Sequence, residues 1–188
     1  MTSNRYIALL RGINVGRAKR VAMADLRKLV GEMGYGEVRS VLNSGNLVFS
    51  ADAVTPGTAA AAIEEQLVLK LGMVARVIVL SRDELATVLA ENSLLPVASD
   101  HSRLLVFTLA DGAARAAVSP LCERDWGLEA LAVGQRAAYV WCPEGVLSSA
   151  AATALGKQLG DNTTSRNWTT LCKLYALCSE AALAPPGA

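Results

Sequence analysis

The sequence is poor in the residues that bind metals and carry out redox chemistry. His101 is its only histidine, and its four cysteines, Cys122, Cys142, Cys172 and Cys178, include no C-x-x-C pair. Zinc sites and thioredoxin-like pairs need closely spaced ligands, so this spacing supports neither. We therefore predict four free thiols, no metal and no cofactor, and we expect His101 to lie in a surface loop.

The chain also has no excess of either charge and no long hydrophobic run. Its 18 lysines and arginines face 17 aspartates and glutamates, unlike the balance of a polybasic nucleic-acid-binding protein. Arg11 interrupts the first apolar run before it reaches the length of a signal-peptide core or a membrane span. We expect a cytoplasmic protein with no membrane partner. The hydrophobic share of 52% is enough to form a packed core.

The first half of the chain predicts four strands and two helices, followed by a third helix. In chain order these are a strand at 5–11, a helix at 23–33, hairpin strands at 38–43 and 46–50 around a two-residue Ser44-Gly45 turn, an alanine-rich helix between Pro56 and Gly72, and a strand at 74–80. Ser81 and Glu84 then form a capping box that opens the third helix.

The second half repeats this order. It predicts a strand at 103–109, a helix at 112–122, hairpin strands at 128–133 and 136–141, a helix at 146–159, a short strand through Thr163 and Thr164, and a final helix from Trp168. The junctions before the two extra helices are similar as well. Ser81-Arg82-Asp83 and Ser165-Arg166-Asn167 both stand where such a helix begins.

Both halves thus follow the order β-α-β-β-α-β-α, which is the ferredoxin-like order with one added helix. The predicted fold class is α+β, with two tandem ferredoxin-like units that are each followed by an extra helix. The first unit covers residues 1–80, a connecting helix and linker cover 81–102, the second unit with the C-terminal helix covers 103–180, and residues 181–188 form a disordered tail.

Positive charge gathers at one end of the first unit. Residues 1–40 contain eight basic and three acidic side chains. The loop after the first strand and the hairpin turn emerge at the same end of such a sheet, so glycines and cations meet there, as an anion site requires. The residues that we expect to form a site for a phosphate-bearing ligand are Arg11, Asn14, Gly16, Arg17, Lys19, Asn43, Ser44, Gly45 and Asn46.

Arg166 and Asn167 form a second candidate patch. Arg166 ends the last strand of the second unit, so topology alone does not bring it to the N-terminal loop. We expect it to be either a surface donor or the partner of a buried carboxylate, and we expect Trp168 to lie in the core.

Simpler interpretations of the N-terminal residues stay open. Gly12 and Gly16 can serve only to shape a loop, and Asn43 and Asn46 only to cap a hairpin. Neither the P-loop nor the dinucleotide-binding pattern occurs. A sheet that recognises RNA by stacking needs aromatic residues on its central strands, where Tyr6 and Phe49 are the only candidates.

Three motifs in order resemble a known bacterial family. They are Arg11-Gly12-Ile13-Asn14-Val15-Gly16 with Lys19, Met23 and Leu26, then Leu42-Asn43-Ser44-Gly45-Asn46, then Thr164-Ser165-Arg166-Asn167-Trp168 with Lys173-Leu174. This set is similar to the domain of unknown function 1697, from about Tyr6 to about Leu177. The resemblance implies two ferredoxin-like halves and no established activity. Arg17, Ala22 and Ser149 depart from the residues usual in that family, which are glycine, proline and lysine.

The leading hypothesis is a cytoplasmic protein that binds a phosphate-bearing small molecule or nucleic acid. One alternative is an enzyme in which Lys19 or Asp25 moves protons and Arg11 holds an anionic substrate. A protein-interaction module is the other. The sequence identifies neither the ligand nor the oligomeric state.

Overall fold

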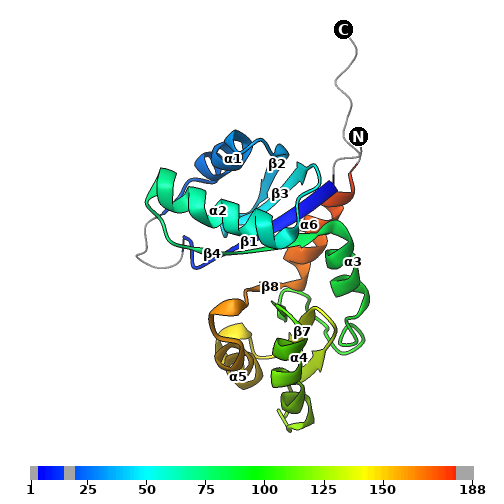
Figure 1. Ribbon diagram of the computed structural model, residues 1–188. Coiled ribbons are helices and arrows are strands. Elements are labelled where there is room, and N and C mark those ends of the chain that lie inside the picture. Colours follow the sequence, from blue (N-terminus) through cyan, green and yellow to red (C-terminus); the bar gives the residue numbers. More distant parts are fainter. Residues whose placement is uncertain (1–3, 15–19, 181–188) are drawn as a thin grey trace.

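The computed structural model describes residues 4–14 and 20–180, which form an α+β fold with two four-stranded antiparallel sheets and six α-helices (Figure 1). The predicted tail at 181–188 and the loop residues Gly16, Arg17 and Lys19 lie outside these residues. None of the helices in the described ranges is long and apolar enough to cross a membrane.

The first sheet has the strand order β2-β3-β1-β4 and the second has the corresponding order β6-β7-β5-β8. The strands are β1 (Asn4–Arg11), β2 (Gly36–Val41), β3 (Asn46–Ala51), β4 (Arg76–Ser81), β5 (Leu104–Thr108), β6 (Ala130–Val133), β7 (Ala137–Trp141) and β8 (Ser165–Asn167). We call the first sheet with α1, α2 and α3 the N-terminal half, and the rest the C-terminal half.

Helices cover the outer faces of both sheets and fill the space between them. They are α1 (Met23–Glu32), α2 (Pro56–Leu71), α3 (Arg82–Ala90), α4 (Gly112–Val118), α5 (Ala150–Leu159) and α6 (Trp168–Ser179), with 3₁₀ turns η1 (Ser119–Glu123), η2 (Val146–Ser148) and η3 (Gly160–Asn162). Figure 1 shows α1 and α2 at one end, α4 and α5 at the other, and α3 and α6 between the sheets.

The central strands are buried on both faces, which explains their unbroken apolar runs. In β1, Tyr6 and Leu10 face a core under α1 and α2, whereas Ile7 and Leu9 face a second core that both sheets share with α3 and α6. In the C-terminal half, β5 is buried in the same way between the shared core and a third core under α4 and α5. The shared core joins the two halves.

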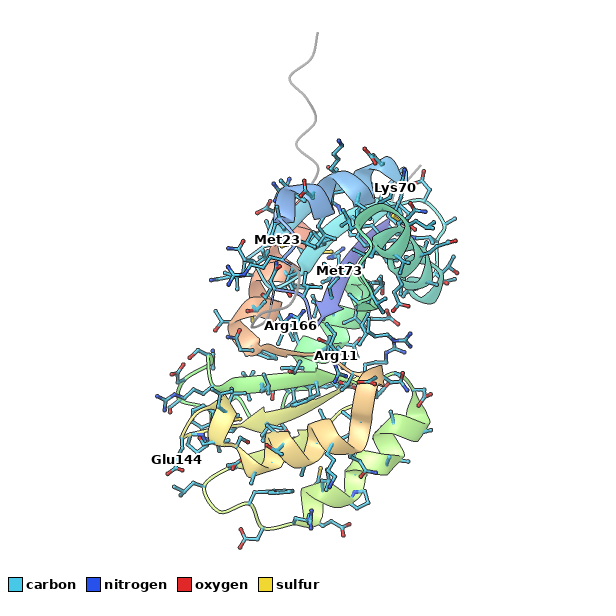
Figure 2. The ribbon with its side chains drawn as sticks, turned by 90° about the vertical axis from the view of Figure 1, so that its left-hand side faces the viewer. Arg11, Met23, Lys70, Met73, Glu144 and Arg166 are labelled. Carbon is cyan, nitrogen blue, oxygen red and sulfur yellow. The ribbon has the colours of Figure 1, made fainter. Side chains whose placement is uncertain are left out.

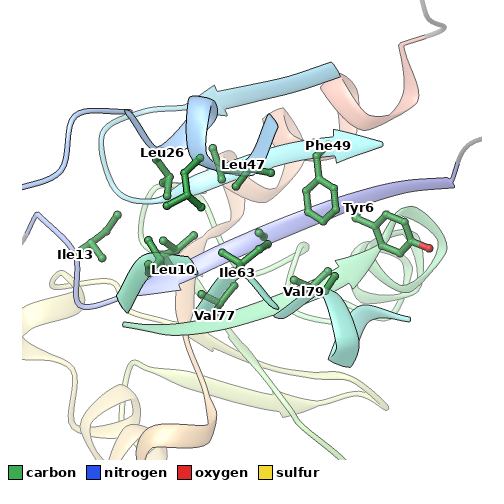
Figure 3. Close-up of a cluster of buried hydrophobic side chains, with 14 of the residues drawn as sticks. Tyr6, Leu10, Ile13, Leu26, Leu47, Phe49, Ile63, Val77 and Val79 are labelled. Carbon is green, nitrogen blue, oxygen red and sulfur yellow. The ribbon is translucent and has the colours of Figure 1, made fainter. Parts of the chain in front are cut away.

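Tyr6 and Phe49 are core residues and not a surface for stacking bases. They are at most 3% exposed, and their ring centroids lie 5.5 Å apart in the core under α1 and α2 (Figure 3). The Tyr6 hydroxyl donates to the Val54 carbonyl at 2.6 Å. The idea that this sheet recognises RNA through these two rings is therefore wrong, because both rings are buried in the core under α1 and α2.

Several predicted boundaries are wrong in detail. The first hairpin turns through four residues, 42–45, and not two, since Val41 pairs with Asn46. Leu42 takes a positive φ of 58° there, a conformation that the two-residue expectation did not include. The helices expected at 112–122 and 146–159 each split into an α-helix and a 3₁₀ turn. Ser149 begins α5 as its N-cap, accepting from the Ala152 amide at 3.0 Å.

The last predicted strand also begins later than expected. Thr163 and Thr164 precede β8 rather than form it. Both are buried, and both form hydrogen bonds with Thr108 at the end of β5. As a result Arg166 lies within the strand. Trp168 is 7% exposed in the shared core, which confirms the expected core position.

Candidate functional site

The β1–α1 connection and the β2–β3 turn lie side by side, as predicted, for residues 11–14 and 43–46. The Leu10 amide donates to the Gly45 carbonyl at 2.8 Å, and Asn14 Nδ2 donates to the Asn43 carbonyl at 3.0 Å. Gly45 has a φ of 76°, and a Cβ there would lie 2.7 Å from Ile13 Cδ1. Only glycine allows this contact, so the turn and the connection are fixed together.

Asn14 ties the two ends of the basic loop to each other. Its backbone is left-handed, with a φ of 57°. Its side chain accepts from the Val21 amide at 2.8 Å and donates to the Val21 carbonyl at 3.0 Å. With the bond to Asn43, both Nδ2 hydrogens are used inside the fold. Asn14 therefore holds the loop in place instead of offering its amide to a ligand.

Asn46 has an internal role as well. It is 0% exposed, and its Nδ2 donates to the Val41 carbonyl at 3.0 Å and to Ser44 Oγ at 2.9 Å. Its Oδ1 accepts from Arg166 Nε at 2.5 Å. The expectation that Asn46 faces a ligand is corrected by this burial. Ser44 and Asn43 of the same turn remain exposed.

Arg166 reaches the N-terminal turn, a contact that topology alone does not predict. It pairs with Val106 across β5 and β8, and Val106 faces the shared core. Paired residues project to the same face of a sheet, so the Arg166 side chain leaves its sheet toward the N-terminal half. Its Nη2 donates to the Leu10 carbonyl at 2.7 Å and to the Ser44 carbonyl at 3.2 Å. The two predicted patches are therefore one region.

All five N–H donors of Arg166 have neutral acceptors. Besides the bonds to the N-terminal half, Nη1 donates to Thr164 Oγ1 at 2.9 Å and to the Ser165 carbonyl at 2.7 Å. Arg166 is thus neither a surface donor nor the partner of a carboxylate. Burial lowers the pKa of its guanidinium to about 10, so the group is still charged at neutral pH. Its positive charge has no acidic partner among the described residues.

Asn167 caps the helix that follows it. As N-cap of α6, its Oδ1 accepts from the Thr170 amide at 2.9 Å and from Thr170 Oγ1 at 2.7 Å. Its side-chain oxygen Oδ1 therefore serves the helix cap and not a ligand.

Arg11 also crosses between the halves. Its Nη1 donates to the carbonyls of Gly160 and Thr163, the latter at 3.0 Å, and its Nη2 lies 3.3 Å from Asp161 Oδ1. The side chain is 39% exposed. Figure 2 shows Arg11 and Arg166 near each other where the two sheets meet. The turn η3 and Thr163, which precedes β8, are thus bonded to the end of β1.

A pocket of about 250 Å³ opens at this place. Arg11 and Gly12 line it from the N-terminal half, and the C-terminal half contributes Phe107, Gly156, Gly160 and residues 163–166. We call it the junction pocket. Within the described part of the chain, Arg11 and Arg166 are the ionisable groups in its lining. Since Arg11 is paired with Asp161, Arg166 contributes the unpaired positive charge.

The residues of the enzyme hypothesis do not share this site. Asp25 is exposed on the first turn of α1, and His101 is exposed with its ring 6.5 Å from the Trp168 ring in an edge contact. Neither lines the junction pocket. Lys19 lies outside the described residues. In the ranges 4–14 and 20–180, no three histidine, cysteine or acidic side chains are grouped so that they could hold a metal ion.

Sequence reasoning did not place Gly160, Asp161 or Thr163 beside Arg11. No local pattern marks them, because the contacts join residues about 150 positions apart. Arg166 was found as a candidate only through its motif, and its partners depend on how the two sheets pack.

The fold and the site define a class of α+β protein with two four-stranded sheets of corresponding strand order and a pocket lined by two arginines where its halves meet. Residues 3–139 match the family described as Protein of unknown function (DUF1697), and the chain belongs to this family. The search of curated proteins found no match.

A solved structure has the same fold. It is "the structure of conserved bacterial protein SP0830 from Streptococcus pneumoniae", with a TM-score of 0.75 and 23% sequence identity. The similarity covers 95% of this chain and 100% of that chain.

Proposed function

We propose that the protein binds a phosphate-bearing small molecule or nucleic acid end in the junction pocket. The observation that carries this proposal is the buried guanidinium of Arg166, whose charge has no acidic partner among the described residues. An unbalanced charge beside an open pocket attracts an anion, since a charge in a region of low dielectric is poorly screened.

Arg11 supplies the direct contact in this proposal. Arg166 has all its donors occupied, so it acts through its charge. Arg11 has five N–H groups, of which the bonds to Gly160, Thr163 and Asp161 use three. Among the described residues the other two N–H groups have no partner, and they donate to a ligand oxygen as charge-assisted hydrogen bonds in this proposal.

Two glycines leave room for a ligand to approach the backbone. Gly12 and Gly160 have φ values of 74° and 61°, and a Cβ at either position would meet no atom of the described residues within 4 Å. Arg17 and Lys19 belong to the loop that Asn14 closes, and we propose that they add positive charge to this site, together with the exposed turn residues Asn43 and Ser44.

The architecture around the pocket supports a duplication. We infer two ferredoxin-like units, at about 1–80 and 103–180, joined by residues 81–102. The shared strand order of the two sheets supports this inference. The ligand site would then lie between two copies of one structural unit, a common location for small-molecule sites.

The experiment is an anion titration followed by melting temperature and calorimetry. Pyrophosphate, ATP and a short 5′-phosphorylated RNA are added to wild type, Arg11→Ala, Lys19→Ala and Arg115→Ala. Arg115 is exposed on α4 and does not line the pocket, so it is the matched control for the loss of one cation.

At least one of these anions should raise the wild-type melting temperature, since a ligand of the native state stabilises it. Arg11→Ala and Lys19→Ala should weaken binding by about tenfold or more, with larger losses at low salt, while Arg115→Ala leaves it unchanged. If no anion binds, or if Arg115→Ala weakens binding as much as Arg11→Ala, the proposal is wrong.

A further inference from the structure

The junction pocket extends beyond its two arginines, around the edge of the second sheet. β8 lies at this edge, since it pairs with β5 alone. Ser165 of β8 pairs with Phe107 of β5, and paired residues project to the same face of a sheet. Phe107 belongs to the core under α4 and α5, so Ser165 lies on that face and Arg166 on the opposite one. The pocket is therefore lined from both faces of the sheet.

The part of the pocket on the α5 side is uncharged. Phe107, Gly156 and Ser165 line it there, and none of these side chains is ionisable. The whole pocket has a volume of about 250 Å³, close to the roughly 300 Å³ at which small-molecule sites begin. A water takes about 30 Å³ of liquid, so a bare phosphate ion fills only part of this space. The rest can hold an uncharged group attached to the phosphate.

Gly156 keeps the uncharged part open. It lies inside α5, where glycine is the least favourable residue after proline. A Cβ at this position would lie 3.7 Å from Phe107 Cε1, an ordinary contact distance. Alanine would therefore fit, so packing among the described residues does not require a glycine. A longer side chain would begin beside Phe107 and take up space that the pocket now offers to a ligand.

Ser165 offers a hydroxyl that the fold does not use. The residue is half-buried in the pocket lining, and its Oγ has no hydrogen-bond partner within the described residues. The hydroxyls before it in the chain are occupied. Thr163 Oγ1 donates to the Thr108 carbonyl at 2.7 Å, and Thr164 Oγ1 accepts from Arg166. A free serine hydroxyl can both donate to and accept from a hydroxyl of a ligand.

We propose that the junction pocket binds the phosphate ester of a sugar, with the phosphate at Arg11 and the sugar over Gly156. This inference rests on the anion binding proposed above. The sugar hydroxyls exchange hydrogen bonds with Ser165 Oγ, and the carbon atoms of the sugar pack against Phe107. A free sugar phosphate and the 5′ end of a nucleic acid share this chemistry, so the experiment has to separate the two sources.

The test is calorimetry of the full chain with inorganic phosphate, n-butyl phosphate, ribose 5-phosphate and a short 5′-phosphorylated RNA. n-Butyl phosphate has the ester and no further hydroxyl. Ribose 5-phosphate should bind about fivefold or more tightly than inorganic phosphate and n-butyl phosphate, because a neutral hydrogen bond contributes about twofold to tenfold. Tighter binding of the RNA than of ribose 5-phosphate would identify a nucleic acid end as the source, and equal or weaker binding a free sugar phosphate.

Two variants alter the sugar part of the pocket. Gly156→Met fills the space beside Phe107 with a flexible side chain that helices accept, and Ser165→Ala removes the free hydroxyl. We expect ribose 5-phosphate to bind Gly156→Met about tenfold and Ser165→Ala about threefold more weakly than wild type. Inorganic phosphate should lose much less affinity, because its contact is with Arg11. Gly31→Met is the matched control, since Gly31 is exposed on α1 and does not line the pocket.

Two results would overturn the inference and leave the anion site in place. One is n-butyl phosphate or inorganic phosphate that binds as tightly as ribose 5-phosphate. The other is an equal loss of affinity for ribose 5-phosphate and inorganic phosphate, or no loss, in Ser165→Ala. If none of these compounds binds, the proposed function fails and this inference fails with it. Should Gly156→Met not fold, Ser165→Ala decides the question independently.

Discussion

The two junctions that lead from a last strand into an extra helix look alike in sequence and differ in structure. At β4–α3 the N-cap is Ser81, whose hydroxyl accepts from the Glu84 amide at 3.1 Å, and Arg82 follows it as an exposed residue. At β8–α6 the N-cap is Asn167, so Arg166 precedes the cap and lies in the strand. The alignment of Ser81-Arg82 with Ser165-Arg166 is therefore wrong by two residues.

This difference of two residues decides the role of each arginine. An arginine after the cap lies on the first helical turn and reaches solvent. An arginine before the cap is still part of the strand, so its side chain projects to one face of the sheet. In β8 this face is the one toward the shared core. The position of the helix cap, and not the local tripeptide, therefore determines which arginine joins the halves.

Replacing the residue after each cap should give the largest difference in unfolding free energy between the two junctions. By the caps, Arg82 corresponds to Trp168, which is 7% exposed in the shared core. Trp168→Ala should cost about 3–5 kcal/mol of unfolding free energy because it leaves a cavity, whereas Arg82→Ala should stay within about 0.5 kcal/mol. Urea unfolding of both variants measures this. Equal midpoints would mean that α6 does not begin in the core as described.

The second contrast is between the two arginines themselves. Arg166→Ala leaves five acceptors in both halves without their donor, and it should cost about 3 kcal/mol. Arg166→Lys keeps the charge but not the planar set of donors, so it should recover only part of this loss. Arg82→Ala again serves as the surface control. A full recovery by lysine would show that charge alone, and not the hydrogen bonds, holds the junction.

Much of the fold follows from sequence periodicity, and the junction does not. The runs in β1 and β5, the repeated order of elements and the meeting of residues 11–14 with 43–46 depend on neighbours close in the chain or on a single sheet. Arg166 contacts Asn46 across 120 positions. That contact requires the packing of two sheets around α3 and α6, which no local pattern specifies. The positive φ of Leu42 was likewise hidden, since leucine rarely adopts it.

A smaller effect is expected at Arg11, the other residue that crosses between the halves. Its two bonds to carbonyls should make Arg11→Ala destabilising by about 1 kcal/mol. The ion pair with Asp161 is largely solvated, so Asp161→Asn should change stability by less than about 0.5 kcal/mol. Chemical denaturation of the two variants compares these contributions. A larger loss in Asp161→Asn than in Arg11→Ala would assign the contact to the ion pair instead.

The smallest expected effects are changes in the rates at which the cysteines react with a thiol reagent. The reaction rate of a buried cysteine reports how often the core around it opens to solvent. Exposed Cys122 should react first with a thiol reagent at pH 8. Burial raises the pKa of Cys178 to about 11 and also raises the pKa of Cys142, so both carry little thiolate and react slowly in the native state. Denatured protein should titrate as four free thiols.

Each of the two buried cysteines reports on a different core. Cys178 lies in the shared core and Cys142 in the core under α4 and α5. Arg166→Ala should therefore speed the labelling of Cys178 more than that of Cys142, as followed by mass spectrometry. Equal acceleration would mean that the C-terminal half opens as one unit.

In the proposed function, the charge of Arg166 and Arg11 makes the junction pocket an anion site. Crystals soaked in tungstate, a tetrahedral anion with a strong anomalous signal, test it most directly. We expect an anomalous peak in the junction pocket within hydrogen-bond distance of the Arg11 guanidinium. Soaked crystals that show tungstate only at other places, or none at all, would contradict it.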